Sequence, residues 1–176
     1  MKTLKILLFS IFILFTSAYA VNLYAEWKIS QNDYVLAFDT SKAKGTIGGL
    51  KGKVSFDPKN LAQSNIQVQV DVNTLDLGMG MKTKHAKADD FFDVEKYPSI
   101  TFNSKSFAKT ASGYVVEGNL KIKDVTKPVK IPFTFTEKGN TGEFLGSFEI
   151  NREDYNLIKK GVGEVVKIDI KLPVTK

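Results

Sequence analysis

Histidine and cysteine, two residue types that many catalytic and metal sites use, are almost absent from this chain. The sequence contains one histidine, His85, one arginine, Arg152, and no cysteine. A cysteine nucleophile and a multi-histidine metal site therefore both lack their essential residues. No Gly-x-Ser-x-Gly sequence marks an activated serine,. We expect no catalytic residue, no metal and no cofactor.

The two rare side chains each have two interpretations. His85 lies at a spacing that places it on the apolar face of a short helix, where it either packs or donates one hydrogen bond to the polar end of a ligand. Arg152 stands next to Glu153 and Asp154, so it either pairs with a neighbouring carboxylate or contacts a ligand head group. The adjacent carboxylates Asp89 and Asp90 would point about 100° apart on a helix, which is typical of a solvated surface.

Alternation of apolar and polar residues predicts the elements that must position these side chains. Between 66 and 73 the sequence IQVQVDVN alternates strictly, which is the period of a strand with one buried face. Similar patterns recur to the end of the chain and are separated by short turns. They predict an all-β, antiparallel meander of about eight strands. Glycines between 45 and 52 favour the bulges that let a sheet curl, and Pro132 indicates an edge or a bulge.

One segment departs from the strand pattern. Met81, His85, Ala88 and Phe92 follow one another at spacings of four, three and four residues, which predicts one face of a short helix crossing near residues 80–90. We expect the helix to end near Asp90. A proline corner at residues 97–98 should then lead into the next strand.

The N-terminal segment is predicted to direct export. Two lysines precede an apolar run of about ten residues, whereas a membrane-spanning helix needs roughly twenty, and residues 18–20 match a signal peptidase site. We therefore expect a cleaved signal peptide at 1–20, one domain at 21–176, a periplasmic or secreted location and no stable membrane anchor.

Without residues 1–20 the chain has 23 basic and 19 acidic residues, a net charge of +4. Its lysines are dispersed along the chain, which argues against nucleic-acid binding. They indicate solvated strand faces or, alternatively, weak attraction to anionic lipid surfaces. An exported chain without cysteine has no disulfides and must depend on its core for stability. The sequence is compatible with either a monomer or a homodimer.

Several motifs occur in a fixed order from Trp27 to about Leu172. They are GKVSFDP at 52–58, His85, DFFDV at 90–94, YP at 97–98, ITF at 100–102, GNLKIKDVTKPV at 118–129 and NREDY at 151–155. In this order they resemble the YceI-like family of secreted lipid-binding proteins. The glycine common in that family after the last motif is replaced by Asn156, a residue that tolerates the left-handed conformation.

The resemblance implies an extended, lipocalin-like barrel whose interior holds a polyisoprenoid or a similar long-chain isoprenoid or acyl lipid. An eight-stranded barrel is about wide enough to be filled by side chains or to hold one small ligand. The alternatives are a stress-response or protein-interaction module with a solid core, and an enzyme that uses His85 on a bound lipid.

Together with the alternation along the strands, the resemblance predicts which residues line the pocket. They are Val54, Phe56, Val68, Val70, Met81, His85, Phe102, Val116, Phe133, Phe135, Phe148 and Ile168. The predicted head-group contacts are His85 and Arg152.

Overall fold

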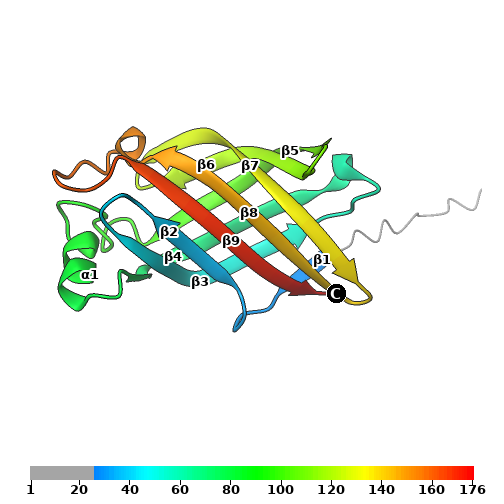
Figure 1. The fold of residues 1–176 in the computed structure, drawn as a ribbon, viewed down its shortest axis with the longest axis horizontal. Coiled ribbons are helices and arrows are strands. Elements are labelled where there is room, and N and C mark those ends of the chain that lie inside the picture. The colour runs from blue at the N-terminus through cyan, green and yellow to red at the C-terminus, as the bar shows by residue number, and fades with distance from the viewer. Residues whose placement is uncertain (1–25) are drawn as a thin grey trace, which may run out of the picture.

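The computed structural model describes residues 26–176, which form an antiparallel barrel with a short helix at one end (Figure 1). The signal peptide predicted at 1–20 lies outside these residues. The strands are β1 (Glu26–Ile29), β2 (Val35–Asp39), β3 (Lys44–Ser55), β4 (Asn65–Asp76), β5 (Ser99–Thr110), β6 (Gly113–Ile122), β7 (Val125–Lys138), β8 (Thr141–Asn151) and β9 (Val165–Thr175). The helix α1 spans Gly80–Lys87, and two 3-10 turns, η1 (Leu61–Gln63) and η2 (Arg152–Tyr155), follow β3 and β8.

The nine strands occupy eight places in the wall. β1 and β2 both pair with β3 on one side and with β9 on the other, so the two short strands share one place. β4 to β9 pair in chain order, and the β3–β4 ladder closes the ring. Every pairing is antiparallel. The predicted antiparallel barrel is therefore confirmed, with the first place divided between two strands.

One end of the barrel is filled with aromatic rings. Phe56 contacts the rings of Phe133, Phe135 and Phe144 at centroid distances of 5.1–5.5 Å. The indole nitrogen of Trp27 donates a hydrogen bond of 3.0 Å to the carbonyl oxygen of Phe56. These contacts lie at the end where β1 meets the C-terminal part of β9 (Figure 1). We call this cluster the aromatic seal, because its rings occupy the space between the strands.

The opposite end is covered by α1 and by the segment around η2 (Figure 1). The predicted helix near residues 80–90 is confirmed, but it ends at Lys87 rather than near Asp90. The predicted buried face is wrong. Met81 is 75% exposed and Ala86 is the buried residue of the helix, because α1 covers the end of the barrel and does not cross its interior. Among the described residues, no helix has the length and apolar character needed to span a membrane.

Candidate functional site

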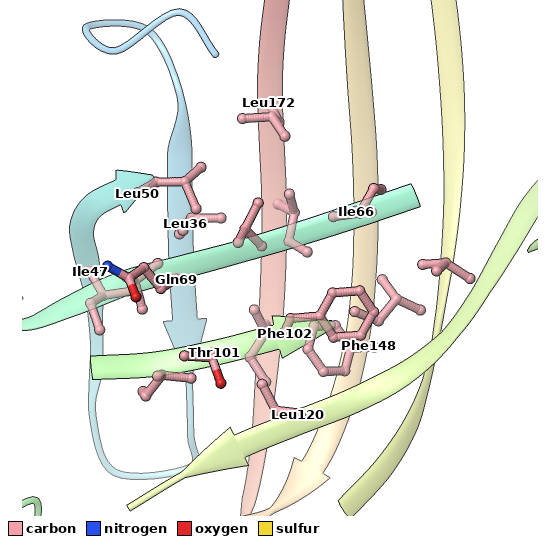
Figure 2. Close-up of a pocket in the computed structure, with 18 of the residues that line it drawn as sticks. Leu36, Ile47, Leu50, Ile66, Gln69, Thr101, Phe102, Leu120, Phe148 and Leu172 are labelled. Carbon is pink, nitrogen blue, oxygen red and sulfur yellow. The ribbon is translucent and has the colours of Figure 1, made fainter. Parts of the chain in front are cut away.

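The middle of the barrel contains a cavity of about 220 Å³ (Figure 2). Inward-facing side chains from β2 to β9 surround it, and its exposed wall is entirely apolar. Alternation along the strands produces this wall, since each strand turns every second side chain inward. The lining residues that Figure 2 labels are Leu36, Ile47, Leu50, Ile66, Phe102, Leu120, Phe148 and Leu172, together with Gln69 and Thr101, whose polar atoms are not exposed in the wall.

Many inward-facing residues are only partly buried, although they lie inside the barrel. Ile66, Ile100, Phe148, Ile168 and Ile170 all belong to this group. In a filled core such residues would be almost completely shielded by their neighbours. Their residual exposure arises because they border the cavity. The interior is therefore packed densely at the aromatic seal and loosely in the middle.

A second cavity, of about 150 Å³, continues the first toward the α1 end. The two share six lining residues: Leu36, Ile47, Ile100, Ile122, Ile150 and Ile168. The wall of the second cavity is also entirely apolar. Together the two volumes reach the lower part of the range of roughly 300–1,000 Å³ that is typical of small-molecule sites. Their arrangement suits a long, narrow, apolar ligand.

Two segments form the roof of the second cavity. Phe91 and Phe92 follow α1, and Leu157 and Val162 follow η2. The rings of Phe91 and Phe92 pack edge to face at 5.2 Å. Backbone hydrogen bonds from Phe91 to Ala88 and from Phe92 to Ala86 fold this segment back on the end of α1, and the chain then turns at Asp93, where φ is 50°.

An ion pair joins the two roof segments. Lys159 Nζ donates to both carboxylate oxygens of Asp90 at 2.8 and 3.0 Å and lies 5.7 Å from the centre of the Phe91 ring. Lys123 also donates a 2.8 Å hydrogen bond to the carbonyl oxygen of Phe91. The hydrogen bond from Lys159 lowers the pKa of Asp90 below its usual value. Asp90 therefore stays ionised, and able to pair with Lys159, to a lower pH than an isolated aspartate.

Arg152 organises the segment that follows it. The side chain is only 3% exposed, and Nε donates to the Gly163 carbonyl oxygen at 2.8 Å. Nη2 donates to the carbonyl oxygens of Lys159 and Val162, both at 3.0 Å, and Nη1 donates to that of Leu157. A buried charge needs such partners, and this guanidinium obtains them from the backbone of one loop.

The predicted pairing of Arg152 with a neighbouring carboxylate is confirmed, since Nη2 lies 3.2 Å from Glu153 Oε1. The predicted contact of Arg152 with a ligand head group stays a prediction. Arg152 borders the second cavity, but the exposed wall there is apolar, and its donors are directed at the protein. Arg152 therefore holds the roof segment, and its charged atoms are not exposed in the wall of the second cavity. The next turn ends at Asn156 with φ of 57°, as expected for the residue that replaces the family's glycine.

The structure places most predicted lining residues around the main cavity. Those bordering it are Val68, Val70, Phe102, Val116, Phe133, Phe148 and Ile168. Val54, Phe56 and Phe135 also face inward, but they belong to the tightly packed end: Val54 and Phe56 are at most 1% exposed, and Phe135 packs 5.3 Å from Trp27. These three residues border neither cavity because the barrel is filled at their level, and their predicted contact with a ligand stays a prediction.

Met81 and His85 also lie away from both cavities. Both side chains are exposed on α1 and border neither cavity. The helix presents them to solvent because only Ala86 turns toward the barrel. An interior packing role does not fit the exposed His85, and its predicted head-group contact stays a prediction.

Several residues that line the cavities were not among those predicted from the sequence. Ile100 and Ile150 border both cavities, and Phe91 and Phe92 form part of the roof. The two isoleucines share the alternating register of residues that were selected, so the signal was present. Phe91 and Phe92 belong to the DFFDV motif, where no strand alternation marks them as lining residues.

The strands β7 and β8 are paired over only part of their length. The β7–β8 ladder extends only to the pair Phe133 and Gly146, so residues 125–132 of β7 and 147–151 of β8 are not paired with each other. Pro132 stands where this ladder stops, in agreement with the predicted edge. A salt bridge of 3.0 Å joins Lys127, in the part of β7 that is not paired with β8, to Asp154 of η2. It links β7 to the segment that follows β8.

Comparison with known proteins identifies the family. A family model described as a YceI-like domain matches residues 27–174. The chain belongs to the YceI-like family. Its relatives include a UPF0312 protein of Vibrio campbellii, 33% identical over 140 residues, which cover 76% of this chain and 74% of the relative. A UPF0312 protein of Yersinia enterocolitica is 34% identical over 119 residues, 64% of this chain and 62% of that protein, so the chain matches less than two thirds of the Yersinia protein.

Solved structures of YceI-like proteins have the same fold. BcnA of Burkholderia cenocepacia superimposes with a TM-score of 0.79 at 28% identity, covering 84% of this chain and 100% of BcnA. A Campylobacter jejuni YceI protein gives 0.70 at 20% identity, covering 78% of this chain and 87% of that protein. A polyisoprenoid-binding domain from Saccharophagus degradans gives 0.66 at 15% identity, covering 86% and 98% respectively. At these identities the last two similarities concern the fold alone.

Proposed function

We propose that this YceI-like protein binds and carries a polyisoprenoid or a similar long-chain amphiphilic lipid inside the barrel. The observation that carries the proposal is the pair of adjoining apolar cavities between the aromatic seal and the roof. The polyisoprenoid-binding domain of Saccharophagus degradans has the same fold, which supports this choice of ligand class.

The binding energy would come from the length of the apolar chain. Burying one methylene group contributes about 0.8 kcal/mol, so a chain of about twenty carbons could contribute roughly 16 kcal/mol before the cost of association. That cost is on the order of 4–15 kcal/mol. Affinity would therefore need few polar contacts, which agrees with walls that expose only apolar atoms.

The two alternatives fit the geometry less well. A protein-interaction module with a solid core would not leave loosely packed isoleucines around an interior space. An enzyme using His85 would need this side chain near the bound lipid, whereas His85 is exposed on α1. We therefore propose that the protein binds its lipid and does not catalyse a reaction on it. The sequence pattern of residues 1–20 supports a periplasmic or secreted site of action.

Native mass spectrometry of the purified protein tests the proposal. We expect an added mass that solvent extraction releases as a prenyl or acyl lipid. A protein that emerges without ligand and does not take up prenyl or acyl chains in a fluorescence displacement assay would contradict the proposal.

A matched pair of variants tests where the lipid binds. Ile100 borders both cavities, so Ile100→Phe should fill the space between them and reduce lipid affinity by about tenfold or more, corresponding to the loss of two buried methylenes. Asn103→Phe places the same ring on the exposed side of the same strand and should leave affinity unchanged. Equal lipid affinity in both variants would locate the ligand elsewhere.

A further inference from the structure

The outer surface of the α1 end carries large apolar side chains that are exposed to solvent. Six large hydrophobic residues are exposed among the described residues, and the four most exposed all lie on segments at this end. Met81 is 75% exposed, Ile158 67% and Met79 55%. The fourth, Val165, begins β9. Exposed apolar groups gathered in one region commonly mark a contact surface.

Positive charge accompanies these side chains. The segment 77–88 contains Lys82, Lys84 and Lys87 and no acidic residue. Lys82 and Lys84 are exposed and form no ion pair with any other residue in the described part of the chain, and the same holds for Lys160. These ammonium groups are therefore available to an external anionic surface.

The two parts of this surface are held at the same end of the barrel. Lys159 follows Ile158 and pairs with Asp90, three residues beyond the end of α1. Figure 1 shows α1 and the segment after η2 together at the end opposite the C terminus. We call Met79, Met81, Ile158 and the flanking lysines the tip.

We propose that the tip docks onto an anionic lipid surface. Met79, Met81 and Ile158 would enter the boundary between head groups and acyl chains, while Lys82, Lys84 and Lys160 contact the anionic head groups. Protein–protein interfaces are depleted in lysine, so apolar residues flanked by unpaired lysines favour a lipid surface over a protein partner. Docking would place the roof of the second cavity at the membrane. Docking would be an interaction in addition to the proposed carrier function. It does not require a lipid to be bound inside the barrel.

Vesicle sedimentation tests the proposal with purified protein. We expect binding to vesicles of phosphatidylglycerol and phosphatidylcholine, about tenfold weaker binding to pure phosphatidylcholine, and a decrease as salt rises from about 50 to 500 mM. Weak binding to both kinds of vesicle would overturn the proposal. Concentration-dependent dimers without vesicle binding would also overturn it, since the tip would then join two copies of the chain.

Matched variants separate the tip from the rest of the surface. Met79→Ser with Met81→Ser should weaken vesicle binding about tenfold or more, whereas Val35→Ser with Leu145→Ser changes exposed apolar residues on the barrel side and should have no effect. Equal losses in the two double variants would contradict docking through the tip.

The lysines are tested in the same way. Lys82→Gln with Lys84→Gln should weaken binding about tenfold or more and reduce its salt dependence. Lys53→Gln with Lys109→Gln removes two exposed charges from β3 and β5 and should change binding much less. If only the total charge mattered, both pairs would behave alike and the proposal would fail.

A fluorescent label can report the docked face directly. The chain contains no cysteine, so Met81→Cys and Leu145→Cys each provide one labelling site. An environment-sensitive dye at position 81 should shift to the blue on addition of anionic vesicles, and the dye at 145 should not. A shift at 145 alone would overturn the proposed orientation. Loss of cargo binding with docking intact would instead reject the carrier function.

Discussion

At the scale of single residues, Arg152 joins the strand β8 to the roof of the second cavity. Its guanidinium donates to four backbone carbonyl groups of the following loop and pairs with Glu153. Planar geometry allows one arginine to satisfy several acceptors at once. The rest of the loop contains few buried side chains of its own, and Leu157 is the main exception. Arg152 therefore determines the shape of this segment.

Replacing Arg152 should destabilise the protein strongly. Arg152→Gln leaves buried carbonyl groups without donors, and we expect the free energy of unfolding in urea to fall by about 3 kcal/mol. Arg152→Lys keeps the charge but not the fork of donors and should still lose more than about 1 kcal/mol. The exposed Lys160→Gln should change stability by less than about 0.5 kcal/mol. A loss below 1 kcal/mol in Arg152→Gln would refute this structural role.

His85 should be dispensable for binding inside the barrel. Because the side chain is exposed and borders neither cavity, His85→Gln should change the free energy of unfolding by less than about 0.5 kcal/mol. Lipid affinity in detergent-free solution should also stay unchanged. A fall of tenfold or more in that affinity would show that α1 reaches the ligand.

At the scale of elements, the strands were predictable and the helix surface was not. The alternation at residues 66–73 identified β4, because a sheet with one buried face imposes a period of two on the sequence. The spacing of Met81, His85, Ala88 and Phe92 suggested a helical face, but α1 ends at Lys87. The last two residues of that spacing therefore never join the helix. The position of α1 over the barrel end depends on tertiary contacts that helical periodicity does not contain.

The short turn η2 gives the protein a defined response to alkaline pH. Tyr155 is 2% exposed, and burial, with a smaller contribution from Asp154, raises its pKa to about 12. In the unfolded chain the phenol ionises near pH 10, whereas in the folded protein it stays protonated until about pH 12. The unfolded state thus loses its proton first, and the free energy of unfolding must fall between these two pH values.

Tyr155→Phe removes this dependence. Each unit of pKa shift corresponds to about 1.36 kcal/mol, so we expect wild type to lose about 2 to 3 kcal/mol relative to Tyr155→Phe between pH 10 and pH 12. Urea titrations of the two proteins across that range measure the difference and cancel the other titrating groups. A stability difference that remains constant with pH would show that Tyr155 is not buried in solution.

At the scale of the whole molecule, the two ends of the barrel differ in their physical character. The aromatic seal fills the interior around Phe56, while the middle and the α1 end retain apolar space. The sequence predicted inward-facing residues at both levels, because alternation reports direction and not the distance to the opposite wall. The alternation therefore predicts that Val54 and Val68 both face inward, although Val54 is fully packed and Val68 borders the cavity. The volume of the interior depends on the distance between opposite walls, so alternation alone does not predict it.

This closed, apolar geometry predicts how affinity should depend on ligand length. Each added methylene should strengthen binding by about 0.8 kcal/mol, or nearly fourfold, until the chain extends from the roof to the aromatic seal. Further carbons would then remain outside the cavities and contribute little. A series of prenyl and acyl chains measured by displacement should therefore show a steep rise followed by a plateau. No polar atom is exposed in either wall. Changing the head group or the salt concentration should therefore change lipid affinity by less than one added methylene does. A curve that follows head-group charge and not chain length would mean that the lipid is held at the barrel surface.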